Sequence, residues 1–156
     1  MENGAEKKEM ENIYLKRPWL KSYPEGVPPD LDIPEISVAQ AFDKATEKWK
    51  DKTAIAFYGS KMSFHELREK VDRFATALHD LGVRKGDRVA LYLLNCPQFP
   101  IAYFGAVKAG AVITSISPVY VTPEVKYQLE DSGAETIICL DTVSYTHLTL
   151  PTKRIV

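Results

Sequence analysis

The sequence predicts an α/β fold built on parallel strands, and three features support this prediction. Arg88 to Asn95 is a nearly unbroken apolar run of strand length, as expected for a strand that is buried on both faces. Pro97 opens a helix-length apolar segment that ends near Gly110, and residues 111–117 then form a second strand pattern rich in Val, Ile and Thr. Strand, helix and strand in about thirty residues make one βαβ unit, whose crossover should be right-handed.

A second crossover follows this unit. Thr122-Pro123-Glu124 predicts a helix start, with Thr as the cap and Pro at the first position. The helix should end at Ser132-Gly133, and Glu135 to Leu140 is a third strand of the buried type. The resulting order, βαβαβ, is half of a doubly wound sheet.

Residues 37–85 predict a helix, a β-hairpin and an amphipathic helix ahead of this sheet. A helical apolar pattern begins at Ser37, and Thr53 to Tyr58 reads as a strand that turns at Gly59-Ser60. Ser63 and Glu66 have the spacing of a capping box at the start of the next helix. That helix should end at Gly82 and bury Leu67, Val71, Phe74, Ala75, Leu78 and Leu81.

The chain divides into four segments by composition. Residues 1–12 are polar and predict a disordered leader, and residues 13–36 carry five prolines and predict an extended arm. Residues 37–142 form the domain. Residues 143–156 are predicted to be a non-native tail, since Ser144 to Thr152 resembles the peptide translated from sequencing-adapter DNA. An authentic edge strand in this tail is the alternative.

Composition excludes several classes of function. The 156 residues are 45% hydrophobic and 26% charged, as in one globular domain, and the net charge of -1 provides no basic field for nucleic acid. No apolar run is long enough for a membrane span, and the N-terminus is not a secretory signal. Cys96 and Cys139 match no metal or redox spacing. We interpret them as buried structural thiols of a cytoplasmic protein.

The candidate chemical motifs have simpler structural explanations. Gly105 and Gly110 have the spacing of a Walker loop, but Ala111 and Val112 stand where Lys and Ser/Thr should be. The motif also lies at the end of a predicted helix, whereas phosphate binds at a helix N-terminus. We therefore interpret these glycines as a close packing contact and a helix stop.

No arrangement of titratable side chains indicates catalysis. The histidines and paired acids have no nucleophile at triad spacing, and we expect them to be solvated. They are His65, His79, His147, Asp30, Asp32, Glu130 and Asp131. We assign no catalytic, cofactor-binding or metal-binding residue.

Three stretches follow one another in a recognisable order: MSFHEL (Met62 to Leu67), LGVRKGDRVALYLLNCPQFPIAYFGAVKAGAV (Leu81 to Val112) and SPVYVTPEVKYQLEDSGAETII (Ser117 to Ile138). Together they resemble the adenylate-forming ligase superfamily, which includes acyl-CoA synthetases, luciferases and peptide-synthetase adenylation domains. The arm from Arg17 to Pro34 is similar to the leader of long-chain fatty-acid–CoA ligases.

The resemblance implies that residues 37–142 are a truncated AMP-binding N-terminal domain of the adenylate-forming ligase fold. It implies a full-length enzyme that uses ATP and Mg²⁺ to form an acyl-adenylate from a fatty acid, and then coenzyme A to form the thioester. The phosphate loop, the adenine-contacting segment, the ribose-binding Asp and the catalytic Lys of the family do not occur here. We therefore expect this fragment to be inactive and to bind none of these cofactors tightly.

The resemblance also implies apolar surface on the isolated piece, around Ile101, Phe104 and Ile113. The expected location is cytoplasmic, at most peripheral to the inner face of the membrane, and no oligomeric state is predicted. Three alternatives stay open: another adenylate-forming ligase with short-chain, aryl or amino-acid substrates; a non-enzymatic flavodoxin-like binding module; and a structural or interaction protein.

Overall fold

A computed structural model describes residues 13–140 and 154–155, and the chain divides into two units, Met1–Glu35 and Ile36–Val156. In the first unit, residues 13–16 are helical and a 3₁₀ helix, η1, spans Pro18–Ser22. The prediction of an extended arm is therefore wrong for residues 13–22. Pro18 is compatible with η1 because it occupies the first position, where its missing N–H is not needed.

An ion pair closes the arm into a loop. The Arg17 guanidinium donates hydrogen bonds to both carboxylate oxygens of Asp30, at 2.7 and 2.9 Å. Asp30 is therefore paired, and not only solvated as predicted. None of the described residues of this unit is buried, and several large apolar side chains are exposed: Ile13, Tyr14, Leu15, Trp19, Tyr23, Val27, Leu31 and Ile33.

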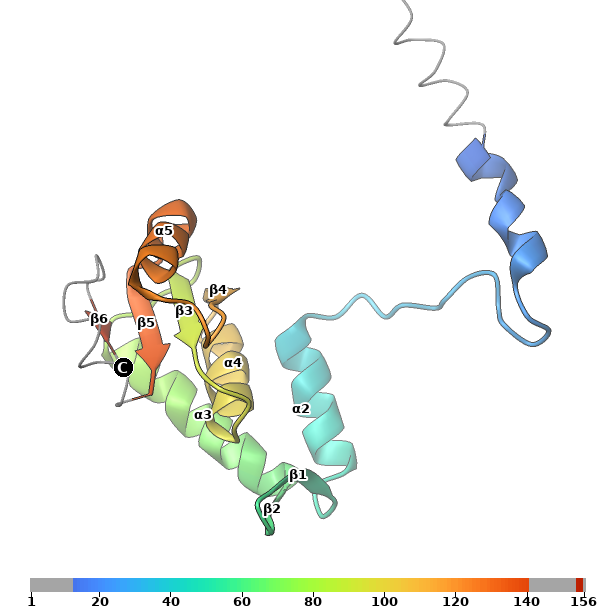
Figure 1. Cartoon of the computed structure of the whole chain (residues 1–156). Coiled ribbons are helices and arrows are strands. Elements are labelled where there is room, and N and C mark those ends of the chain that lie inside the picture. The colour runs from blue at the N-terminus through green and yellow to red at the C-terminus, as the bar shows by residue number, and fades with distance from the viewer. Residues whose placement is uncertain (1–12, 141–153, 156) are drawn as a thin grey trace, which may run out of the picture. The chain divides into compact units, whose positions relative to one another are not determined.

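The second unit carries the predicted order of helices and strands (Figure 1). The elements are α2 (Val38–Lys48), β1 (Thr53–Phe57), β2 (Ser60–Ser63), α3 (Phe64–Asp80), β3 (Arg88–Tyr92), α4 (Gln98–Lys108), β4 (Val112–Ser115), α5 (Thr122–Ser132), β5 (Thr136–Cys139) and β6 (Arg154–Ile155). No helix among residues 13–140 combines the length and apolar character needed to cross a bilayer.

Local signals in the sequence determine where α3 begins. The Ser63 hydroxyl accepts a hydrogen bond from the Glu66 N–H at 3.2 Å, and the Glu66 carboxylate accepts one from the Ser63 N–H at 2.7 Å. This confirms the predicted capping box. These hydrogen bonds lower the pKa of Glu66, so its carboxylate stays ionised and continues to cap the helix.

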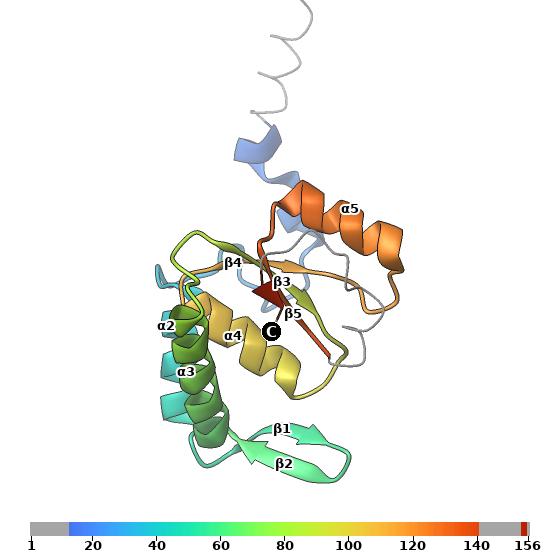
Figure 2. The same ribbon diagram turned by 90° about the vertical axis from the view of Figure 1, so that its left-hand side faces the viewer.

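The four-stranded sheet has the order β4-β3-β5-β6, and each neighbouring pair is parallel. Its central strand, β3, is buried on both faces. Val89 and Leu91 pack with α3 and α4 in one apolar cluster, and Ala90 and Tyr92 pack with α5 in another. Figure 2 shows α5 and α4 on opposite sides of the strands. The doubly wound arrangement predicted from the sequence is confirmed.

Two local predictions were wrong by one or two residues. The hairpin turn is Tyr58-Gly59, because both residues have positive φ (44° and 83°) and Phe57 pairs with Ser60. Leu81 is 48% exposed, since α3 has ended and Val83 occupies the core position instead.

The cap of α5 and the cysteines also differ from the predictions. The N-cap of α5 is Val121, and Thr122 is the first helical residue. Cys96 and Cys139 are free thiols as expected, but both are only half-buried, because each lies at or beyond the carboxyl end of its strand. Burial raises the pKa of the Cys139 thiol, so it stays protonated at neutral pH.

The apolar surface expected around three residues of the sheet and α4 is smaller than predicted. Ile101, Phe104 and Ile113 are half-buried. Phe104 stacks on Phe42 of α2, with ring centroids 4.3 Å apart. Helix α2 therefore covers part of the apolar surface that we expected to be exposed.

Most of the predicted non-native tail lies outside the described residues, and so does His147. Within the tail, Arg154 and Ile155 form β6 and pair with Thr136 and Ile137 of β5. The foreign origin of residues 143–156, like the predicted leader at residues 1–12, stays a prediction.

Candidate functional site

The carboxyl ends of β3 and β4 are the natural place to look for a ligand site. The chain leaves β3 toward α4 on one face of the sheet, and it leaves β4 toward α5 on the other face. Ligands of doubly wound proteins bind where the connections of adjacent strands diverge in this way. A cavity of about 540 Å³ lies beside the second of these connections, between the loop after β4 and the first turns of α5.

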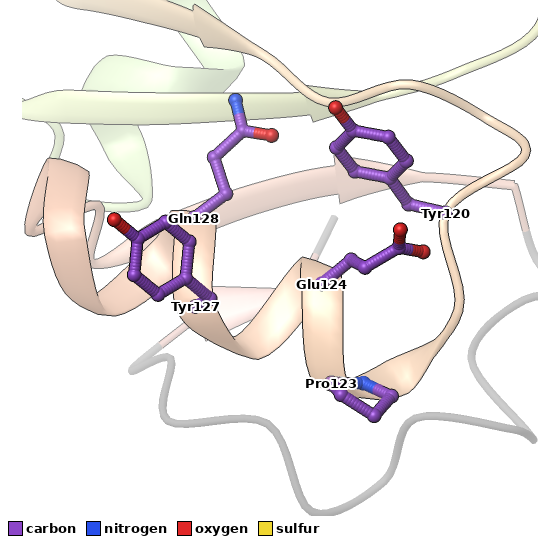
Figure 3. Close-up of a pocket in the computed structure, with 5 residues that line it drawn as sticks. All are labelled: Tyr120, Pro123, Glu124, Tyr127 and Gln128. Carbon is purple, nitrogen blue, oxygen red and sulfur yellow. The ribbon is translucent and has the colours of Figure 1, made fainter.

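Five residues line this cavity, which we call the Tyr120 pocket: Tyr120, Pro123, Glu124, Tyr127 and Gln128. Figure 3 shows Glu124, Tyr127 and Gln128 extending from α5, with Tyr120 facing them from the preceding loop. Tyr120 is 39% exposed and Tyr127 is 70% exposed. The pocket thus presents two accessible aromatic rings and their hydroxyls.

The remaining polar side chains of the pocket hold the local structure together. The Gln128 amide donates to the Ser115 carbonyl at 2.9 Å and to the Thr114 hydroxyl at 3.2 Å, which ties α5 to β4. The Glu124 carboxylate accepts a hydrogen bond from the Val121 N–H at 2.9 Å and so caps the helix. Because both side chains are already hydrogen-bonded within the protein, they mainly stabilise the shape of the pocket.

Tyr92 anchors the loop that carries Tyr120. Its ring is 5% exposed at the end of β3, and its hydroxyl donates to the Tyr120 carbonyl at 2.7 Å. Burial raises the pKa of Tyr92, so the hydroxyl remains a donor across the physiological range.

We expect Tyr92→Phe to lower the free energy of unfolding by about 1 kcal/mol, because the Tyr120 carbonyl loses its donor. Urea denaturation measures this difference. Tyr127→Phe is the matched control, since its exposed ring can hydrogen-bond to water. Equal stabilities of the two variants would show that the Tyr92 hydroxyl does not hold the loop.

The described residues offer no catalytic centre. His65 and His79 lie on the surface of α3, with side chains 64% and 67% exposed, and Glu130 and Asp131 are exposed at the end of α5, as predicted. Residues 13–140 contain no group of three or more His, Cys, Asp or Glu side chains that could hold a metal ion. The residues that line the Tyr120 pocket include no Ser, Cys or His that could act as a nucleophile or its base.

The glycine motif does not hold phosphate. Gly105 lies within α4, and Gly110 follows the C-terminus of that helix with φ 84°. The backbone groups at this end are carbonyls, which repel an anion. The Gly105–Gly110 segment therefore does not fit the phosphates of a nucleotide.

The sequence reasoning missed the Tyr120 pocket because its walls depend on tertiary contacts. The pairing of Gln128 with β4 joins residues 13 positions apart, and no local pattern indicates it. The Pro123-Glu124 helix start was the only usable signal.

A parallel sheet with helices on both faces and a pocket where its connections diverge makes residues 36–140 an α/β domain of the doubly wound class. The model of the AMP-binding enzyme family matches residues 42–155. The chain belongs to the AMP-binding enzyme family, and the predicted resemblance to adenylate-forming ligases is confirmed.

Individual relatives refine this assignment. The chain is 37% identical over 141 residues to a long-chain-fatty-acid–CoA ligase of Bacillus subtilis, covering 90% of this chain and 25% of that protein. It is 37% identical over 134 residues to the Yersinia pestis protein of the same name, covering 85% of this chain and 24% of that protein. A crotonobetaine/carnitine–CoA ligase of Salmonella paratyphi A is 36% identical over 107 residues, or 65% of this chain and 21% of that protein.

Solved structures agree with the fold. A benzoate CoA ligase from Burkholderia xenovorans matches with a TM-score of 0.70 and 25% identity, over 78% of this chain and 26% of that chain. The chain spans about a quarter of the length of the curated relatives it matches. It therefore corresponds to part of the N-terminal domain of the adenylate-forming ligase fold, as predicted.

Proposed function

We propose that this chain is the N-terminal part of an acyl-CoA ligase. In the first step, a carboxylate oxygen attacks the α-phosphorus of ATP, giving an acyl-adenylate and pyrophosphate. In the second, the coenzyme A thiolate attacks the acyl carbon and AMP leaves, giving the thioester. Family membership over residues 42–155 is the observation that carries this proposal. It disfavours the flavodoxin-like module and the purely structural protein.

The proposed substrate of the whole protein is a long-chain fatty acid. Residues 37–156 number 120, whereas the alignments with long-chain ligases extend over 134 to 141 residues. These alignments must therefore include part of the arm, while the 107-residue alignment with the crotonobetaine/carnitine ligase need not. An aryl acid is the second candidate, because one of the similar solved structures is a benzoate CoA ligase.

ATP, Mg²⁺ and coenzyme A are proposed as reactants of the whole protein only. The glycine motif lies at the C-terminus of α4, which does not suit phosphate, and residues 13–140 contain no group of three or more side chains that could hold a metal ion. The near-neutral net charge of -1 supports neither a nucleic acid partner nor strong attraction to anionic lipid. We propose a cytoplasmic enzyme that is at most peripheral to the inner face of the membrane.

The purified 156-residue chain should show no ATP–pyrophosphate exchange above background with palmitate or benzoate, because the phosphate-loop motif that the resemblance implies for the family does not occur in its sequence. Radiolabelled pyrophosphate incorporation into ATP measures this directly. Exchange above background would refute the assignment of this piece as inactive.

The whole protein encoded by the source DNA should form palmitoyl-CoA from palmitate, ATP and coenzyme A. Benzoate is the matched competing substrate. Formation of benzoyl-CoA in preference would move the assignment to an aryl-acid ligase, and the absence of any thioester would overturn the ligase proposal.

A further inference from the structure

Strand β4 forms one outer edge of the four-stranded sheet. It pairs with β3 on one side, and no strand among the described residues pairs with its other side (Figure 1). Natural edge strands are usually protected by charged side chains, prolines or β-bulges. The pairing of β4 with β3 runs from Val112 to Ser115 without a register shift, and no charged residue lies between Lys108 and Glu124. Residues 111–117 also contain no proline. The edge of β4 is therefore open and lacks these protections.

The hydrogen bonds of this segment show which of its backbone groups face outward. The N–H groups of Val112 and Ile116 donate to carbonyls on the β3 side, at 2.8 and 2.9 Å, and the Gly110 carbonyl accepts an N–H from the same side at 2.9 Å. The backbone groups of successive strand residues point alternately to the two sides of the strand. The odd-numbered residues therefore direct their N–H and carbonyl groups away from β3: Ala111, Ile113 and Ser115.

Two of these outward groups already have partners within the chain. The Ser115 carbonyl accepts a hydrogen bond from the Gln128 amide at 2.9 Å, and the Ala111 N–H donates to the Ala106 carbonyl at 3.0 Å. The Ala111 carbonyl, both backbone groups of Ile113 and the Ser115 N–H have no partner among the described residues. Along the chain, the edge thus offers an acceptor, a donor, an acceptor and a donor.

We propose that β4 pairs with β4 of a second copy of this chain, antiparallel and around a two-fold axis at Ile113. In this register, Ile113 faces its own counterpart and the two residues exchange both hydrogen bonds. The Ser115 N–H of each copy donates to the Ala111 carbonyl of the other. Every unpaired group of the edge is then satisfied, and Gln128 keeps its hydrogen bond to the Ser115 carbonyl.

Two features of the edge favour a second copy of this chain over a different partner. The order of donors and acceptors is its own complement when the strand is reversed, as a two-fold interface requires. Identical strands can also place like charges opposite each other, which is destabilising, but residues 109–123 carry no charge. The inference does not rest on the proposed ligase function, because it concerns only the edge of the sheet.

Sedimentation velocity of the full 156-residue chain should show a monomer–dimer equilibrium. Because β4 has only four residues, we expect a weak dimer, with a dissociation constant on the order of 100 μM. A monomer at every concentration up to about 1 mM would overturn the proposal. Assemblies that grow beyond the dimer would also overturn it, because a two-fold interface closes after two copies.

Replacing Ser115 tests the outward N–H group. Ser115 is exposed, and edge strands tolerate proline where the N–H faces outward. Ser115→Pro removes this donor and should weaken the dimer by about tenfold or more. Ser115→Ala is the matched control, since it removes the hydroxyl, keeps the N–H and should dimerise like the wild type. Circular dichroism establishes that each variant folds, and equal dissociation constants of the two folded variants would contradict the proposed pairing.

Disulfide cross-linking tests the register, and does so even if Ser115→Pro fails to fold. In the proposed dimer, Val112 faces Thr114 of the other copy in a non-hydrogen-bonded pair, with Cα atoms about 4.5 Å apart, close enough for a disulfide. Each of these residues lies about 7 Å along the strand from its own counterpart, and the spacing between the strands adds to this separation. Cysteines placed at identical positions are therefore too far apart to link.

An equal mixture of Val112→Cys and Thr114→Cys should form a covalent dimer on oxidation, whereas either variant alone should not. Non-reducing gel electrophoresis measures the yield. The native thiols, Cys96 and Cys139, are present in all three samples, so the comparison isolates the introduced pair. Cross-linking of either variant alone as efficiently as the mixture would overturn the two-fold register at Ile113, and so would a mixture that does not cross-link.

Discussion

Replacing Gly105 with valine is expected to lower the free energy of unfolding by about 3 kcal/mol, one of the two largest effects we predict. Gly105 is buried where α4 meets α3. A Cβ atom at this position would lie 2.7 Å from the Phe74 Cδ1 and 3.3 Å from the Phe74 Cβ. It would also approach the Ala75 backbone nitrogen at 3.4 Å. Rotating the Phe74 ring relieves only the first contact, so α3 and α4 must separate.

Urea denaturation measures the effect, and Ala77→Val is the control. Ala77 is exposed on α3, so its replacement by valine should cost only helix propensity, less than about 0.7 kcal/mol. A double-mutant cycle with Phe74→Ala should return about 1 kcal/mol of the loss at Gly105, because the closest atom is removed. Equal stabilities of Gly105→Val and Ala77→Val would show that the helices do not meet as closely as the structure indicates.

The same contact explains the two-glycine motif of the sequence. Gly105 permits α3 to approach α4, and Gly110 ends α4 with a positive φ of 84°, which L side chains rarely adopt. The spacing that suggests a phosphate loop therefore arises from helix packing and helix termination. The sequence-based interpretation of these glycines is confirmed.

Elements with strong local signals could be predicted from the sequence. The unbroken apolar run predicts β3 because this strand is buried on both faces. The Ser63–Glu66 capping box predicts the start of α3 because its side chains bond to the first free N–H groups. Gly133 predicts the end of α5 because it takes the left-handed C-cap conformation, with φ 64°. The order of these elements then favoured only a few topologies. This is why the doubly wound sheet could be predicted without its register.

Features that depend on distant residues could not be predicted. The amphipathic pattern predicted that Leu81 is buried in the core. The helix ends at Asp80, however, so Leu81 is exposed and Val83 is buried in its place. The Tyr120 pocket depends on Gln128 of α5 reaching the Ser115 carbonyl at the end of β4. Periodicity says which face of an element is buried, but not which partner covers it.

Lys108 provides the clearest case of such a long-range contact. Its replacement is the second of the two substitutions for which we expect a large loss of stability. Its ammonium group hydrogen-bonds to Asp43 of α2 at 2.8 Å and to Asp72 of α3, and its side chain is 19% exposed. Arg68 adds a pair with Glu47 at 2.9 Å and lies 3.9 Å from both aspartates. Two cations and three carboxylates therefore join α2, α3 and α4.

We expect Lys108→Met to lower the free energy of unfolding by about 2 kcal/mol, since Asp43 and Asp72 lose their hydrogen-bonded cation and keep only the longer, 3.9 Å contacts with Arg68. Methionine has similar length and helix propensity, so the change isolates the charge. Lys126→Met is the matched control: its pair with Glu130 is 3.8 Å long and exposed, and its loss should cost less than about 0.5 kcal/mol. Equal losses in the two variants would mean that the network contributes no more than a surface pair.

The contribution of Lys108 should also disappear at alkaline pH. Burial alone would lower the pKa of Lys108, but the hydrogen bonds to Asp43 and Asp72 outweigh it, and the pKa is raised above its ordinary value of 10.5. A raised pKa in the folded state means that folding favours the protonated lysine. The stabilisation is therefore complete below the unfolded pKa and is lost as pH rises through the folded value. The difference in unfolding free energy between wild type and Lys108→Met should stay constant from pH 7 to about 10 and shrink above that. A difference that persists undiminished above the folded pKa would assign the effect of Lys108 to packing of its aliphatic stem, and not to its charge.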